Sequence, residues 1–311
     1  MWRVVDPLDV FLLRIFILDG LTPDLIALQL FTGLALGAIY VLLALGMSLL
    51  FGMLTVVNFA HGAFYMLGAY AGIALLGIGV NFWLCLLFAP LIVGSLGLLA
   101  ERFLIRRLYG RGIDYPLLLT FGLSYMMVEV IRIVFGTNGL PFETPDALQG
   151  ASDIMIGYFP TYRLFVIAVA VVVLVALWLF LERTPYGLII RAGARDPQIV
   201  RILGIDVARV WLVVFGIGTG LAGLAGLLAA PLQGASPEMG ASILAESFVV
   251  TVVGGMGSLV GAVIAGVLVG VVVAMTSLFA PEFAQVAIFA LMAIVLLIRP
   301  QGFFGRAGLM S

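Results

Sequence analysis

The sequence predicts an all-α membrane protein, a polytopic bundle of transmembrane helices. Of its 311 residues, 64% are hydrophobic and only 10% are charged. Predominantly apolar stretches of about 20 residues are typical of transmembrane helices. Residues 25–100 contain no Asp, Glu, Arg or Lys, so this run alone has room for about three crossings. We expect about 8–9 crossings, some of them broken, in a single permease-like domain over residues 1–311.

The individual crossings follow from the turn residues and charges that interrupt the apolar runs. In the first half we expect helices over Leu25–Leu50, Val56–Val80, Phe82–Ala100 and Tyr115–Phe135. In the second half we expect Leu164–Leu181, Val210–Ala230, a short piece Glu246–Val253, a long piece Leu259–Ser277, and Glu282–Ile298. Within the N-terminal segment 1–24, Val10–Leu18 is too short to span and is predicted to lie on the bilayer surface.

Two basic segments predict which side of the membrane each loop faces. Every basic side chain is Arg, and nine of the 15 lie in residues 101–114 or 182–209. Loops rich in Arg remain in the cytoplasm by the positive-inside rule. The connectors Gly136–Arg163 and Pro231–Ala245 carry Glu or Asp, with Arg only at position 163, so we place them outside. The tail after Ile298 carries Arg299 and Arg306, which predicts a cytoplasmic C-terminus.

The composition excludes several functional classes. Without Lys the chain cannot build the phosphate-binding loop of an ATPase. With a single His and a single Cys, no convincing Ser-His-Asp or Cys-His set can be placed, and a metal site lacks ligands. A net charge of −1 does not point to nucleic acid. We therefore expect neither an enzyme nor a cofactor in this chain.

Two interruptions of the apolar runs predict broken helices. The first is Phe51–Gly62, and the second is Gly254–Ser258. Because the loop before the second break is placed outside and the C-terminus inside, residues 246–281 must supply an even number of passes. The short Glu246–Val253 is then a half-helix that enters the bundle. A Gly-interrupted segment in each half suggests a weak internal repeat with a substrate path between the halves. The candidate path residues are Asn58, His61, Gly62, Gly254, Gly255, Gly257 and Ser258.

Polar side chains within apolar runs are costly unless they are hydrogen-bonded. Asn58 and His61 share a face if that segment is helical, and they either cap and tie the broken backbone or line the path. The Gly254–Ser258 break either presents a helix N-terminus to a carboxylate or is a packing kink. Glu129 and Arg132, three residues apart, are predicted to form an ion pair. Glu246 either caps the short helix or lines the outer mouth.

The basic segment 182–209 contains a predicted short helix outside the membrane. Asp196 is a suitable N-cap, Pro197 suits the first helical position, and Gly204 ends the helix. Ile199, Ile202 and Leu203 then share one face. Such an amphipathic helix either lies on the membrane surface or docks a cytoplasmic protein.

Three stretches resemble one family, the LivH-like permeases of branched-chain amino acid ABC importers. They are GLALGAIYVLLALGMSLLFGMLTVVNFAHGAFYMLGAY at Gly33–Tyr70, PYGLIIRAGARDPQIVRILGIDVARV at Pro185–Val210, and VVGGMGSLVGAVIAG at Val252–Gly266. The resemblance extends from about Leu25 to Gly302, and its most specific piece is NFAHG.

The resemblance implies a permease subunit in the bacterial inner membrane. Its partners would be a second homologous permease, two cytoplasmic ATP-binding subunits, which bind the ATP, and an extracytoplasmic solute-binding protein. The residues implied to engage the ATPase are Ala192, Gly193, Asp196, Leu203, Gly204 and Ile205. The Arg195-Asp196-Pro197 run departs from the plainer polar run of the family. The implied substrates are branched-chain or related amino acids, with urea or short amides as alternatives. An ion-coupled carrier that uses His61 and Glu129 is a separate alternative.

Overall fold

The computed structural model describes residues 22–54, 58–109, 111–112, 114–155 and 157–305, so the predicted interfacial helix at Val10–Leu18 lies outside the described residues. The long helices of the first half are α2 (Pro23–Leu54), α3 (His61–Gly77), α4 (Phe82–Phe103), α5 (Asp114–Phe135) and α6 (Thr161–Arg183). The second half has α9 (Val207–Gln233), α10 (Met239–Gly254), α11 (Leu259–Phe279) and α12 (Ala284–Ile298). Between the halves lie two short helices, α7 (Pro185–Arg195) and α8 (Pro197–Ile202).

The remaining elements are short. The 3₁₀ turns are η1 (Ile105–Leu108), η2 (Asp146–Leu148) and η3 (Pro281–Phe283). One antiparallel hairpin pairs β1 (Ala151–Asp153) with β2 (Tyr158–Pro160), with Ser152 opposite Phe159. The hairpin is a small addition to the predicted all-α bundle and lies in the connector before α6.

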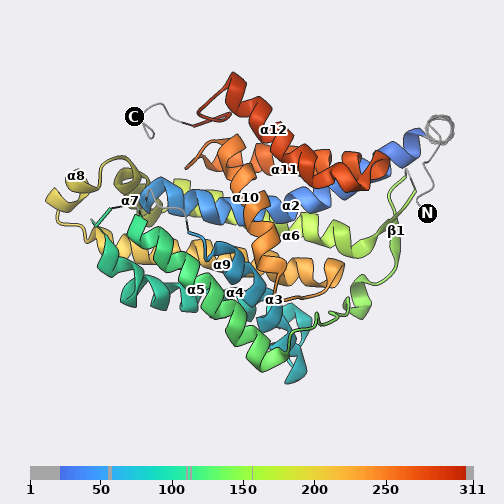
Figure 1. Cartoon of the computed structure of the whole chain (residues 1–311), viewed down its shortest axis with the longest axis horizontal. Coiled ribbons are helices and arrows are strands. Elements are labelled where there is room, and N and C mark those ends of the chain that lie inside the picture. Colours follow the sequence, from blue (N-terminus) through green and yellow to red (C-terminus); the bar gives the residue numbers. More distant parts are fainter. Residues whose placement is uncertain (1–21, 55–57, 110, 113, 156, 306–311) are drawn as a thin grey trace, which may run out of the picture.

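The helices confirm a polytopic membrane bundle. Among the described residues, seven helices can cross a membrane by length and apolar composition: α2, α4 with η1, α5, α6, α9, α11, and α12 with η3. The shorter apolar helices α3 and α10 have 17 and 16 residues. The bundle is elongated, and most of its long helices run roughly along the long axis, whereas α10 lies across it (Figure 1).

The two ends of the bundle differ in character. At one end lie α7, α8 and η1, which carry the basic segments, and we call this the basic end (Figure 1, left). At the opposite end lies the hairpin, near the start of α2 (Figure 1, right). Arg163, at the start of α6, donates from Nη1 to the Thr32 hydroxyl of α2 at 3.0 Å. The helices α2 and α6 therefore both start at the opposite end and run toward the basic end.

Small residues set the spacing of the central helices. α2 packs along α11, and α9 packs against α2, α3 and α4. A Cβ at Gly37 would lie 3.0 Å from the Gly266 carbonyl oxygen of α11, and one at Gly223 of α9 would lie 2.7 Å from the Val93 Cβ of α4. This close approach replaces the hydrophobic driving force that membrane helices lack. The glycines of α9 therefore let neighbouring helices pack closely against it.

The structure corrects the sequence-based boundaries around α10. The predicted loop Pro231–Ala245 is wrong, because α9 continues through Pro231 to Gln233 and α10 begins at Met239. Pro231 was interpreted as a helix end, but its missing N–H is tolerated in the last turns of a membrane helix. The predicted eight-residue half-helix is instead a helix of 16 residues, and Glu246 lies in its middle rather than at its start.

Candidate transport site and coupling surface

The described residues 58–60 of the first predicted break, Phe51–Gly62, lie between α2 and α3 and are held by side chains. Asn58 is not on a helical face with His61 as predicted, because it precedes α3 and its Oδ1 accepts a hydrogen bond from the Ala60 N–H at 3.1 Å. The Phe59 N–H donates to the Thr120 hydroxyl of α5 at 3.2 Å. Asn58 and Thr120 are both buried. The polar groups at this break thus replace the helical hydrogen bonds that the interruption removes.

His61 joins the start of α3 to the middle of α2. Its side chain is fully buried, and Nε2 lies 3.0 Å from the Leu43 carbonyl oxygen. A carbonyl oxygen only accepts, so Nε2 carries the proton and Nδ1 has the lone pair. Nδ1 and the Asn58 amide nitrogen have no hydrogen-bond partner among the described residues. The geometry is that of a tie between helices, which was one of the two interpretations that the sequence left open.

The second break, residues 254–258, is closed by backbone groups. Gly255 and Gly257 have φ values of +98° and +79°, a region that L side chains rarely adopt. The segment after α12 lies across the break: the Phe303 N–H donates to the Val253 oxygen at 2.8 Å, and the Phe304 N–H donates to the Gly254 oxygen at 3.0 Å. Ser258 caps α11 by accepting from the Gly261 N–H at 3.1 Å.

The end of α2 meets the second break at Gly257. A Cβ at Gly257 would lie 3.2 Å from the Gly52 Cα, so the end of α2 touches the turn that starts α11. The His61 contact at Leu43 lies nine residues earlier on α2, which is about 14 Å along a helix. Gly62 instead packs its backbone against the backbone of Gly240 in α10. The predicted path residues therefore line the length of α2 and α10 rather than form one cluster.

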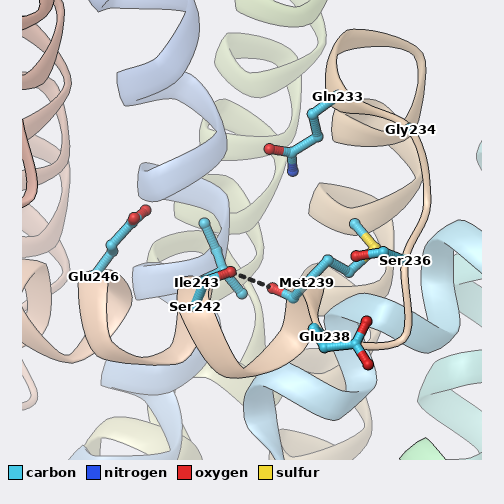
Figure 2. A pocket seen from close by; sticks show the side chains of 8 residues that line it. All are labelled: Gln233, Gly234, Ser236, Glu238, Met239, Ser242, Ile243 and Glu246. Atoms are coloured by element: carbon cyan, nitrogen blue, oxygen red, sulfur yellow. Dashed lines mark hydrogen bonds between the residues drawn. The ribbon is translucent and has the colours of Figure 1, made fainter. Parts of the chain in front are cut away.

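A cavity of about 270 Å³ lies at the opposite end, between the end of α9 and the first turns of α10. Figure 2 shows Gln233 reaching from α9 toward the space that α10 lines with Ser242, Ile243 and Glu246. Its volume is just below the range usual for drug-sized ligands, which suits a small molecule. Glu246 therefore lines this cavity. The cavity itself was missed, since its residues lie in the segment assigned to a loop.

Polar groups from four helices surround the floor of this cavity. The Gln233 amide donates to the Tyr65 hydroxyl of α3 at 2.8 Å. The Tyr40 side chain of α2 lies beside the Glu246 carboxylate. Tyr40 and Tyr65 are buried. No sequence motif marks these two tyrosines, and the only available signal was a carboxylate at position 246 within an otherwise apolar run.

The rim of the cavity holds an ion-pair network that includes the predicted pair. Arg132 Nη1 lies 2.5 Å from Glu129 Oε1, which confirms the predicted pair, and Arg132 Nη2 lies 2.8 Å from Glu238 Oε1. The hydrogen bond from Arg132 lowers the pKa of Glu238. The turn after α9 is also tied by a backbone bridge between Leu140 and Ala235, with N···O distances of 2.7 and 2.9 Å. The mouth is thus fixed to α5 and to the connector before α6.

At the basic end, the predicted short helix is confirmed as α8. Asp196 Oδ1 accepts from the N–H groups of Gln198 and Ile199 at 2.9 and 3.0 Å. Gly204, at φ +80°, follows the end of the helix. Ala192 and Gly193 belong to a separate helix, α7, which was not anticipated. Asp196 separates the two helices because its extended backbone caps the second one.

Large apolar side chains are exposed on α8. Ile199, Ile202 and Leu203 are 56%, 83% and 72% exposed, and we call these three residues the α8 patch. Ala192 and Gly204 are exposed, Ile205 is half-buried and Gly193 is buried. An apolar patch on a helix outside the spanning segments indicates an interaction surface.

A polar and aromatic network connects α8 to the spanning helices. The buried Glu101 of α4 accepts from Tyr109 Oη at 3.1 Å and pairs with Arg106 Nε at 3.4 Å. Arg106 Nη2 also donates to the Ala208 oxygen at the start of α9, at 2.7 Å. Burial raises the pKa of Tyr109, whose ring meets that of Trp211 at a centroid distance of 5.0 Å.

The Arg201 guanidinium of α8 lies over the Trp211 ring, 5.8 Å from its centroid. This contact connects α8 to α9, and the hydrogen bonds of Glu101 and Arg106 connect α9 to α4.

The family model for the permease component of branched-chain amino acid transport systems matches residues 29–296. The chain belongs to this permease family. It is 30% identical over 293 residues to the high-affinity branched-chain amino acid transport system permease protein LivH of Salmonella typhimurium, covering 89% of this chain and 95% of that protein. The permease BraD of Pseudomonas aeruginosa is 30% identical, with coverage of 89% and 95%. LivM of Escherichia coli is 31% identical, covering 85% of this chain and 67% of that permease.

Membership of this permease family confirms the resemblance inferred from residues 33–70, 185–210 and 252–266. Family membership also confirms that the chain is a multi-pass membrane permease and not an enzyme. The seven long apolar helices among the described residues agree with a multi-pass membrane protein. Among solved structures, PsaBC from Streptococcus pneumoniae in complex with Fab gives a TM-score of 0.48 at 14% identity, covering 92% of this chain and 94% of that one. That likeness is too low to define a shared fold.

Proposed function

We propose that this chain is the permease subunit of an ATP-driven importer in the bacterial inner membrane. It forms the transmembrane path for branched-chain or related amino acids, which a solute-binding protein delivers on the outer side. The observation that carries the proposal is the α8 patch, on a helix fixed by the Asp196 cap and placed beside the basic segments. Family membership and the names of the relatives supply the substrate class.

The sidedness follows from the basic segments. Positive-inside placement puts α7, α8 and η1 in the cytoplasm. The cavity at the opposite end then opens outward, toward the solute-binding protein. The segment after α12 contacts the second break beside the end of α2, which packs against α7, so the C-terminus is cytoplasmic as well.

The conformational change of the ATP-binding subunits is transmitted to the transmembrane path through α8. One of two cytoplasmic ATP-binding subunits covers the α8 patch, with Ala192, Gly193, Asp196, Leu203, Gly204 and Ile205 as the contact region. Movement of α8 passes to α9 through Arg201 and Trp211, and to α4 through Arg106 and Glu101. A second, homologous permease completes the membrane part, because LivH and LivM relatives both resemble this chain. ATP is bound by the partner subunits, and no cofactor is assigned to this chain.

The test is co-purification of the ATP-binding subunits together with uptake in reconstituted vesicles. Ile202→Glu places a charge on the α8 patch without creating a cavity, so the complex is expected to lose its ATP-binding subunits and most of its uptake. Asp196→Arg removes both cap hydrogen bonds and is expected to abolish uptake with normal membrane insertion, as is a bulky residue at Gly204. Met155→Glu is the matched control, since Met155 is 99% exposed at the opposite end. Retention of the ATP-binding subunits by Ile202→Glu would contradict the coupling assignment.

An ion-coupled carrier is the alternative. The sequence suggested His61 and Glu129 for such a role, yet His61 is fully buried against α2 and Glu129 is paired with Arg132. Uptake in vesicles that contain ATP, with the proton gradient collapsed, separates the two mechanisms. We expect uptake to continue, and its loss would favour the carrier. Replacing leucine by urea or a short amide in the same assay tests the other substrate classes.

A further inference from the structure

Glu246 is a carboxylate whose environment lacks a compensating charge. It lies seven residues beyond Met239, which is about 10 Å along α10. The ion pairs found among the described residues join other groups, and Glu246 takes part in none of them. The neutral Tyr40 side chain of α2 lies beside it. A carboxylate without a paired cation in an apolar helix is expensive and marks a functional position.

The neighbouring Tyr40 hydroxyl does not explain why this residue is acidic. A glutamine offers the same oxygen acceptor to that hydroxyl and would cost less to desolvate. A cationic group that enters the cavity would compensate the charge of the carboxylate. The cation nearest the mouth, Arg132, is already held by Glu129 and Glu238 at the rim.

The cavity around Glu246 also suits an aliphatic side chain. Ile243 and Met239 line it and are themselves buried, while Gln233 and Tyr65 present polar groups from α9 and α3. A small ligand with one ammonium group and one apolar portion matches this lining (Figure 2). Glu246 and Gly254 lie eight residues apart on α10. A ligand in the cavity would therefore contact the same helix that ends at the second break.

We propose that Glu246 receives the ammonium group of the amino acid as it enters from the outer side, with Tyr40 beside the carboxylate and with Gln233, Met239 and Ile243 lining the rest of the site. The proposal rests on the proposed function and adds the position at which the substrate is held.

The test compares two replacements whose expected order depends on the role of the carboxylate. Glu246→Gln keeps the size and an acceptor oxygen beside Tyr40 but removes the charge, whereas Glu246→Asp keeps the charge and shortens the side chain. Both are measured as ATP-driven leucine uptake by the complete importer in proteoliposomes, with leucine-loaded binding protein and the proton gradient collapsed. We expect Glu246→Gln to lower the initial rate at least tenfold, since hydrogen bonds to charged groups are the strong ones. Glu246→Asp is expected to retain more activity than Glu246→Gln.

The matched control is Glu282→Gln, the same chemical change at an exposed carboxylate that does not line the cavity. It should stay within about twofold of the native rate, because an exposed surface charge contributes little. Equal or higher activity of Glu246→Gln compared with Glu246→Asp would overturn the proposal and show that the side chain is only a hydrogen-bond acceptor. If native uptake stops when the proton gradient is collapsed, Glu246 belongs to proton movement and the proposal is overturned. If the native complex does not transport leucine at all, the proposed function itself fails.

Discussion

Asn58, His61 and Thr120 close the first break with their side chains, whereas glycine backbone and the segment after α12 close the second. In the described part of the first break, the N–H groups of Phe59 and Ala60 and the Leu43 carbonyl are each bonded to one polar side-chain atom. At the second, the Phe303 and Phe304 N–H groups take up the carbonyls at the end of α10, and left-handed glycines make the turn. The first break therefore depends on specific polar side chains, and the second depends on glycines that allow close backbone contacts.

The largest effect is expected at Gly255. Gly255→Ala combines a φ of +98° with a new Cβ that would lie 2.7 Å from the Gly305 Cα, so both the backbone conformation and the packing fail. We expect a loss of about 3 kcal/mol or more in the free energy of unfolding, measured by denaturant titration in detergent. Gly136→Ala is the control, because Gly136 has φ +92° and open space around it. It should cost only about 1–2 kcal/mol, and an equal cost at both positions would mean that packing at the second break is unimportant.

The next effect concerns the segment that covers the second break. Phe303→Pro removes the N–H that reaches the Val253 oxygen and disfavours the conformation of the preceding Gly302, at φ +73°. Phe303→Ala removes the same ring but keeps the N–H. The proline variant is expected to be about 2 kcal/mol less stable than the alanine variant in the same titration. Equal stabilities would show that these backbone hydrogen bonds do not close the break.

A smaller effect is expected at His61. His61→Phe keeps a ring of similar shape and removes the hydrogen bond to the Leu43 carbonyl, which should cost about 1–2 kcal/mol. His61→Ala also leaves a cavity and should cost about 2–4 kcal/mol. Uptake per folded complex separates the two roles considered for this residue. Unchanged uptake in His61→Phe indicates a structural tie, while a further tenfold fall indicates that His61 lines the path.

The smallest effects are expected at the two caps. Asn58→Ala and Ser258→Ala each remove one side-chain hydrogen bond at the start of a helix and should each cost about 1 kcal/mol. Asn58→Asp and Ser258→Thr keep an acceptor oxygen and serve as controls. A cost at Ser258 that exceeds the cost of His61→Phe would show that the second break also depends on a side chain, and the contrast between the breaks would then fail.

The sequence was sufficient for the features that depend on local chemistry. The apolar runs located the spanning helices, and the Arg-rich segments distinguished the two ends. The Asp196-Pro197 and Gly204 signals located α8, because a cap and a stop are encoded within a few residues. The interruptions at residues 52–62 and 254–258 were visible because Gly, Asn and His are unusual within apolar runs.

Only the tertiary structure decided which groups meet. A spanning helix is apolar toward both lipid and protein, so hydropathy does not show which face is buried or where α10 begins. The contact of Tyr40 with Glu246, the bond from Gln233 to Tyr65, and the cover of Phe303 over Val253 join residues far apart in the chain. Such pairs form because a buried polar group must find a partner, and the partner is set by the packing of the helices rather than by the neighbours in sequence.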